Sequence, residues 1–511
     1  MLVSILSYKS RHRRADLFSG INIQGSQMNE TRTLANWVAG LRHESIPANV
    51  REHAKRFILD NLGCQIAGAT LPWSQSYYDV IRRTRGGSHS TVTYFGDKLS
   101  PDDAAFINSA FNHANDTDDT HLKSPTHPGS VAMPASLAMA EYTNASGEDL
   151  LVAVIAAYEV HIRISWACSP FLHYRGHHPP VACGPFGAAA ASAMLMGLDP
   201  EQTLNALSIS GSHSAGLMEY ANNGGSVKRI HSGIAVQAGV RAALFSEAGI
   251  TGPHSILEGE KGFCKVFAGE YDLKRLTHGL GTRYELMDNG LKPHSCCHVI
   301  HATLDTLDKI RETQPLKPDE IKSIKVYMNS DRLQALVGTI VEPEDVLGAQ
   351  FSLPFSVAMR LHHGGRGVNG GNGFWDYPHI DLKDSKLRET ARKVKCLVAT
   401  DNEWACVDKC AGVAIETNDG RLIEDVVPFS KGLPENPMSA EEVKEKFHAL
   451  VDPILPPGRP REIVDAIDNI ERMESMEELV RLLIVPPTGR LKVKAGGRAA
   501  EAYANIEEER L

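Results

Sequence analysis

The first half of the chain repeats apolar residues at helical spacing in long, alanine-rich runs. The segments TRTLANWVAGL (31–41) and PANVREHAKRFILDNLGCQIAGA (47–69) place apolar side chains three or four positions apart, as amphipathic helices do. GPFGAAAASAMLMGL (184–198) is so rich in small residues that we expect it to pack closely against other helices. The pattern predicts no strand before about residue 280. Further helices are predicted over 101–114, 132–143, 147–166, 183–196, 200–213 and 231–248.

The pattern changes in the second half, where apolar and polar residues begin to alternate. IKSIKVYM (321–328) alternates as a half-buried strand does. GVAIETNDGRLIEDVV (412–427) predicts two strands joined by an Asn-Asp-Gly turn. We therefore expect a small α+β unit in this half. Helices are predicted at 297–312 and 351–362, among these strands, and again from 439 to about 484.

This order of elements predicts the domain organisation. A chain that is helical, then α+β, then helical again indicates a mainly α fold, in which a large all-helical domain carries an inserted smaller α+β lid domain. We expect the helical domain to comprise residues 28–287 and 431–511, and the lid to comprise residues 288–430. Residues 1–27 are expected to form a disordered leader. Its basic residues, with no acid before Asp16, leave a mitochondrial transit segment as the alternative.

Composition and charge exclude several classes of protein. The chain is 42% hydrophobic and 23% charged, so it can bury a large core. The net charge of −9 argues against a nucleic-acid partner, because phosphate binding needs clustered Lys and Arg. No uninterrupted apolar run reaches the roughly 18 residues of a membrane span, so we expect no membrane partner. The nine cysteines contain no CxxC pair, and we expect a reducing compartment, the cytoplasm.

The stretch HANDTDDTHLKSPTHPGS (113–130) concentrates titratable side chains in one loop. It is not a calcium loop, because the sixth position is His121 rather than Gly and the twelfth is His127 rather than Glu. A zinc or iron site lacks the support of HxxxH or HxH spacing, and we expect no metal. The residues that such a site could still use are His113, Asp118, Asp119 and His121.

Two other interpretations of this loop stay open. One is a solvated turn whose aspartates cap the next helix. The other is a proton-transfer site, in which a helix end delivers Asp116 and Thr120 while a Pro-Gly turn fixes the imidazole of His127.

Three later segments present further candidate side chains. In YRGHHPPVACG, two prolines hold the backbone of His178 extended just before a small-residue helix. In NNGGSVKRIHSG, Lys228 stands at a helix start, where a cation is electrostatically misplaced unless an anion binds there. In LKPHSCCHVIH, Lys292 is expected to enter a helix through a proline, where the helical domain gives way to the lid. Structural histidines and a solvated loop are the alternatives.

Taken together, these segments offer two presented histidines, two lysines and an Asp/Thr pair. This set suits a substrate with several carboxylates, which lysines and helix N-termini would hold while a histidine moves a proton on the adjacent carbon. Because the chain contains no dinucleotide fingerprint, P-loop or GxSxG motif, redox, phosphoryl-transfer and acyl-transfer enzymes are disfavoured.

The chain resembles the MmgE/PrpD family. The resemblance rests on ILDNLGCQIAGA, DTDDTH, SPTHPGSVAMPA, HHPPVACGPFGAAAA, GGSVKRIHSG and KPHSCCHVIH, and it extends over roughly residues 30–485 in the family's order. It implies a helical domain with a smaller α+β lid, a homodimer, and no metal or organic cofactor. It also implies that His127 and His178 transfer a proton and orient the substrate. The remaining residues implied to bind the substrate carboxylates are Asp116, Thr120, Lys228 and Lys292.

The resemblance also bears on the reaction. The family's decarboxylase branch carries a tyrosine at the position of Phe355 and a histidine at the position of Cys297. We therefore expect a lyase of a small di- or tricarboxylate, a hydro-lyase that dehydrates a 2-methylcitrate-type hydroxy acid as 2-methylcitrate dehydratase does. The alternatives are epimerisation of an iminodisuccinate-type acid, decarboxylation of cis-aconitate, and a non-catalytic carboxylate-binding homologue.

Overall fold

A computed structural model describes residues 29–223, 225–363, 371–399 and 410–490 of the chain. The structure is 58% helix and 8% strand, which confirms the mainly helical fold. The predicted leader, residues 1–27, lies outside the described residues.

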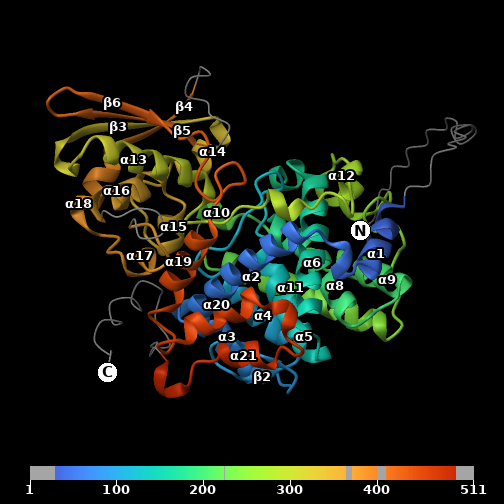
Figure 1. The fold of residues 1–511 in the computed structure, drawn as a ribbon. Helices are drawn as coiled ribbons and strands as arrows, with labels where there is room; N and C mark the ends of the chain where they lie inside the picture. Colours follow the sequence, from blue (N-terminus) through green and yellow to red (C-terminus); the bar gives the residue numbers. More distant parts are fainter. Residues whose placement is uncertain (1–28, 224, 364–370, 400–409, 491–511) are drawn as a thin grey trace, which may run out of the picture.

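The helical part of the molecule is built around α8 (Pro179–Leu195) and α11 (Lys228–Glu247), which pack on each other (Figure 1). Both begin about one turn earlier than the apolar pattern predicts. Gly239 of α11 permits the close approach, because a Cβ there would lie 2.3 Å from the carbonyl oxygen of Pro185 in α8. The other helices of this part are α1 (Glu30–Gly40), α2 (Ala48–Gly68), α3 (Pro72–Thr84), α4 (Pro101–Asn112), α5 (Gly129–Thr143), α6 (Gly147–Cys168), α7 (Phe171–Tyr174), α9 (Pro200–Gly211), α10 (Tyr220–Asn223) and α12 (Lys274–Thr277).

A four-stranded sheet lies at the other end of the molecule (Figure 1). The central strand β3 (Ile321–Met328) pairs in parallel with β4 (Val394–Val398) and antiparallel with β5 (Cys410–Thr417). β5 also pairs with β6 (Leu422–Val426), which confirms the predicted hairpin. β4 is not predicted by the sequence pattern, because this short strand follows a helix with no turn residue between them.

Helices cover the sheet on one side. α13 (His301–Thr313) packs on β5 and β6. It begins four residues later than the predicted helix at 297–312, because a short 3₁₀ turn (His298–Ile300) precedes it. The other helices of this part are α14 (Asp331–Val337), α15 (Val346–Gln350), α16 (Leu353–His363), α17 (Asp376–His379) and α18 (Ser385–Arg392).

One prediction about strands is wrong. Two short strands, β1 (Ser90–Thr91) and β2 (Lys98–Leu99), pair antiparallel within the first half of the chain, where we expected no strand. A strand of two residues is too short to produce a visible alternation of apolar and polar positions.

The C-terminal helices lie against the first part of the chain. A Cβ on Gly63 of α2 would lie 3.0 Å from the ring of Phe447, so the first of these helices packs tightly on α2. One hydrophobic cluster also continues from α2 into the sheet, where it includes Val326 of β3. The inserted lid and its boundaries at residues 288 and 430 therefore stay predictions. The C-terminal helices are α19 (Ala440–Val451), α20 (Arg459–Asp468) and α21 (Glu477–Leu482).

One described helix, α6, is long and apolar enough to cross a membrane by length and composition alone. However, 94% of its most apolar window is buried inside the protein, as in a core helix. Its apolar character is explained by this packing.

Candidate active site

The loop after α4 brings distant segments together. His113 caps the end of α4, and Asp116 then adopts a left-handed backbone conformation with φ of 54°. Such a conformation is costly for a residue with a side chain, and it is often retained at functional sites. Further along, Thr120 and Gly290 exchange two backbone hydrogen bonds of 2.8 Å between N and O. These bonds hold the loop against the segment that carries Lys292.

Two lysines from distant parts of the chain meet at one carboxylate. Lys228 Nζ lies 3.0 Å and Lys292 Nζ lies 3.3 Å from Oδ1 of Asp116, and all three side chains are buried. Although burial alone would raise it, the two ammonium groups hold the pKa of the Asp116 carboxyl well below its usual range. The two ammonium groups have more N–H donors than the Asp116 carboxylate uses, so donors remain for one further anionic group.

His127 is held in one orientation by the loop that precedes it. Its Nδ1 lies 2.7 Å from the backbone carbonyl oxygen of Asp119. Because a carbonyl only accepts, Nδ1 carries the proton and Nε2 carries the lone pair. The Asp119 carboxylate accepts from the N–H of Gly129 (2.9 Å) and the hydroxyl of Tyr158 (2.6 Å). Burial lowers the pKa of His127 to about 3, so the imidazole is neutral at pH 7 and can accept a proton.

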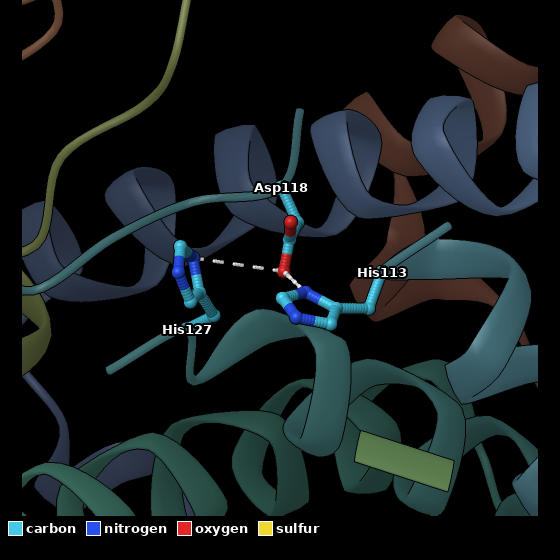
Figure 2. Close-up of side chains that lie close together, drawn as sticks. All are labelled: His113, Asp118 and His127. Atoms are coloured by element: carbon cyan, nitrogen blue, oxygen red, sulfur yellow. Dashed lines mark hydrogen bonds and ion pairs between the residues drawn. The ribbon is translucent and has the colours of Figure 1, made fainter. Parts of the chain in front are cut away.

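A second imidazole and a carboxylate lie beside His127 (Figure 2). His113 Nδ1 lies 2.8 Å from Asp118 Oδ2, and His113 Nε2 lies 3.1 Å from Lys228 Nζ. The same Asp118 oxygen lies 3.8 Å from His127 Nδ1. That distance is too long for a hydrogen bond but short enough for a strong charge interaction in a buried site. The Asp118 carboxylate therefore interacts with both imidazoles, through a hydrogen bond with His113 and a charge interaction with His127.

His178 occupies a different environment. It precedes the first residue of α8, and its Nδ1 lies 3.0 Å from Nδ1 of His231 on α11. Its ring also lies 5.3 Å from the ring of Tyr220 and 6.1 Å from that of His113. Burial and the neighbouring His231 hold the pKa of His178 well below its usual value. The imidazole is therefore neutral and can donate or accept one hydrogen bond.

Three of these groups could in principle hold a metal ion. The ligand atoms of His113, Asp118 and His127 lie within 4.8 Å of one another (Figure 2). However, both Nδ1 atoms face acceptors, His113 toward Asp118 and His127 toward the carbonyl of Asp119, so both carry protons. A metal ion bound at these atoms would have to displace the protons. As the structure describes them, the three groups form a hydrogen-bonded cluster.

The structure brings most of the predicted site residues together. Asp116, Lys228 and Lys292 are in direct contact, and His127 and His178 join them through His113. Thr120 is connected to Lys292 only through the backbone of its segment.

Two features of the site differ from the sequence analysis. Lys292 does not enter a helix, because residues 291–297 are irregular and the 3₁₀ turn begins only at His298. His113 and Asp118, considered earlier only as metal ligands, belong to the cluster itself. The density of titratable residues in the loop was the signal that pointed to them.

The two positions that bear on the reaction lie on the sheet side. Cys297 packs against a small apolar cluster that includes Tyr220 and Phe351. The ring of Phe351 lies 5.8 Å from Lys228 Nζ, so this cluster borders the lysines. Phe355, on α16, is fully buried.

A buried cluster of imidazoles, lysines and carboxylates on a helical fold is suited to proton transfer on an acidic substrate. The family models for the MmgE/PrpD N-terminal domain and the MmgE/PrpD C-terminal domain match residues 32–276 and 294–472. The chain belongs to the MmgE/PrpD family, as its motifs indicate.

Curated relatives align with nearly the whole chain. The cis-aconitate decarboxylase-like protein oryM of Aspergillus oryzae is 28% identical over 89% of this chain and 97% of its own length. Cis-aconitate decarboxylase of Aspergillus terreus is 29% identical over 89% of this chain and 96% of its own. The human cis-aconitate decarboxylase is 27% identical over 89% and 95%. These names do not support the expected dehydration of a 2-methylcitrate-type acid.

Proposed function

We propose that the protein is a lyase that acts on a small di- or tricarboxylate without a metal or organic cofactor. The observation that carries this proposal is the meeting of Lys228 and Lys292 at Asp116, beside the neutral imidazole of His127. The ammonium groups supply a buried positive charge for the substrate carboxylates. The homodimer implied by the resemblance and the cytoplasmic location predicted from the cysteines stay predictions.

The arrangement supports chemistry at a carbon next to a carboxylate. The two lysines would hold the carboxylate and stabilise the negative charge that develops on it when the carbon carries an electron pair. His127 would exchange a proton with that carbon through Nε2, which has the free lone pair. His178 would orient the substrate through a hydrogen bond without adding charge.

Decarboxylation of a cis-aconitate-type acid is the first candidate reaction. The carbon–carbon bond to one carboxylate breaks, carbon dioxide leaves, and the electron pair left on carbon accepts a proton. The relatives named as cis-aconitate decarboxylases support this reaction. Because its low pKa leaves His127 neutral, it would first take up a proton from the substrate or from solvent. It would then deliver this proton to the carbon.

Dehydration of a 2-methylcitrate-type hydroxy acid is the second candidate. It is favoured by Cys297 and Phe355, which provide no imidazole or hydroxyl where the decarboxylase branch has them. The lone pair at Nε2 of His127 could take the proton that dehydration removes from the substrate.

The test is to incubate the purified full-length protein with a panel of di- and tricarboxylates that includes cis-aconitate and 2-methylcitrate, and to follow each acid by mass spectrometry. Loss of carbon dioxide supports decarboxylation, and loss of water supports dehydration. Solvent deuterium gained without loss of mass would indicate an epimerase. Thermal stabilisation by an acid that is never converted would indicate a binding protein and contradict the proposal. The His127→Ala protein, prepared in the same way, is the control for contaminating activity.

A further inference from the structure

Lys228 is held by two acceptors of different kinds. Its Nζ lies 3.0 Å from Asp116 Oδ1 and 3.1 Å from His113 Nε2. An ammonium group has three N–H donors and no acceptor, so His113 Nε2 must present its lone pair to Lys228. Two of the three donors are thereby used, and the third stays available to a substrate carboxylate.

Asp118 determines which nitrogen of His113 carries the proton. Its Oδ2 lies 2.8 Å from Nδ1 of His113, and both side chains are fully buried. Although burial would raise it, the imidazoles of His113 and His127 hold the pKa of Asp118 well below its usual range, so the carboxylate is ionised and can only accept. His113 therefore carries its proton at Nδ1, and this leaves Nε2 free to accept from Lys228.

We propose that Asp118 is a positioning residue of this site: by fixing the Nδ1–H tautomer of His113, it makes His113 Nε2 the acceptor that orients the Lys228 ammonium toward the substrate. Across 3.8 Å, the same carboxylate also stabilises the protonated form of His127. This inference rests on the proposed function for what the substrate is, but the tautomer itself can be observed without any substrate.

The opposite tautomer would disrupt the site. With the proton at Nε2, His113 would direct an N–H at the Lys228 ammonium, and two donors would face each other at 3.1 Å. Lys228 would turn away, and the position that holds the substrate carboxylate would lose one of its two cations.

The direct test is neutron diffraction from crystals of the full-length protein without substrate. The proposal expects a hydrogen on Nδ1 of His113 and none on Nε2. A hydrogen on Nε2 overturns it. Because this measurement needs no turnover, it stays decisive even if no acid in the panel is converted, so the failure of the inference and that of the proposed function are distinguishable.

Variants test the consequence for activity. We expect His113→Leu and Asp118→Ala each to lower kcat/KM by about 100-fold, the scale of a lost acid–base or charge interaction in a buried site. His113→Gln should stay within about tenfold of the wild type, because its amide can still accept from Lys228 and donate to Asp118. The double variant His113→Leu/Asp118→Ala should have a kcat/KM no lower than that of either single variant, since the effects of residues that act as one unit are not additive.

A matched control exists in the same protein. His294 and Asp305 form another imidazole–carboxylate pair, with Nε2 3.0 Å from Oδ1, and no described contact connects that pair with Lys228. Asp305→Ala should leave the kcat/KM ratio of the His113→Gln and His113→Leu proteins unchanged. A His113→Gln protein as damaged as His113→Leu, or losses that multiply in the double variant, would overturn the positioning role.

Discussion

His127 and His178 stand at similar places in the chain but in different surroundings. Each lies on a proline-containing turn directly before a buried helix, α5 and α8 respectively. His127 faces the carbonyl of Asp119 and the carboxylate of Asp118. Among the described residues, His178 contacts two imidazoles and a phenol, and no carboxylate.

Because the two turns are alike and the neighbouring groups differ, the neighbouring groups determine what each imidazole can do. An imidazole that takes up a proton becomes a cation, and a nearby carboxylate lowers the free energy of that state. Asp118 supplies this carboxylate to His127, whereas burial, His231 and the Lys228 ammonium disfavour a protonated His178. We therefore propose that His127 transfers the proton and that His178 orients the substrate.

The variant with the largest expected loss of activity is His127→Ala. We expect kcat/KM for the converted acid to fall by about 100-fold or more, the usual loss when a general base is removed. Steady-state kinetics with the acid identified by mass spectrometry gives the value. Activity equal to that of the wild type would remove His127 from the mechanism.

His178→Gln should have a smaller effect. Glutamine can still donate or accept a hydrogen bond but cannot become a cation, so we expect a loss of about tenfold, expressed mainly in KM. The measurement is the separate determination of kcat and KM. A loss as large as that of His127→Ala, expressed in kcat, would mean that His178 transfers the proton.

Cys297→His would place an additional imidazole near Tyr220, on the side of His178. If the resemblance to the decarboxylase branch identifies this position correctly, the ratio of carbon dioxide release to water release should rise about fivefold, the effect of one hydrogen bond of about 1 kcal/mol. Cys396→His, at a cysteine in β4 of the sheet, is the control. An unchanged ratio in Cys297→His would show that this position does not select the reaction.

The smallest effect is on stability. Burial lowers the pKa of His127 to about 3 and that of His231 to about 4, below the ordinary value near 6.5. Between pH 6.5 and 4 the unfolded chain binds protons that the folded protein does not, so stability is present above pH 6.5 and is lost as the pH falls. Between pH 7 and 4, the Tm of His127→Gln and that of His231→Gln should each fall less than the Tm of the wild type, by on the order of a few degrees.

Scanning calorimetry from pH 7 to 4 measures this slope. The exposed His254→Gln is the matched control, because its side chain is 66% exposed. Slopes equal to that of the wild type in both buried-histidine variants would contradict the neutral state of these imidazoles.

Much of the fold could be predicted because its pattern is local. The small-residue run of α8 and the alternation of β3 each depend on a few consecutive residues. β4 could not be predicted, because its pairing partner β3 lies some 70 residues earlier and nothing within VKCLV itself reveals the parallel pairing. The strands β1 and β2 could not be predicted because two residues are too few to show an alternation of apolar and polar positions.

The sequence pointed to the residues that the structure brings together, but not to the contacts between them. Lys228 stood out because a cation at a helix start needs an anion, and the structure provides Asp116. The link between His113 and Asp118 was not visible, since it depends on the conformation of the loop between them, in which Asp116 has a left-handed backbone. Backbone conformation of this kind is not encoded in residue spacing.

Whether Lys228, Lys292 and His127 form the substrate site is tested most directly by a crystal structure of the full-length protein with cis-aconitate bound. We expect one substrate carboxylate to accept hydrogen bonds from Nζ of both Lys228 and Lys292, with an adjacent carbon facing Nε2 of His127. Cis-aconitate bound with its carboxylates away from both lysines, or with His127 turned from it, would contradict the proposed roles of these three residues.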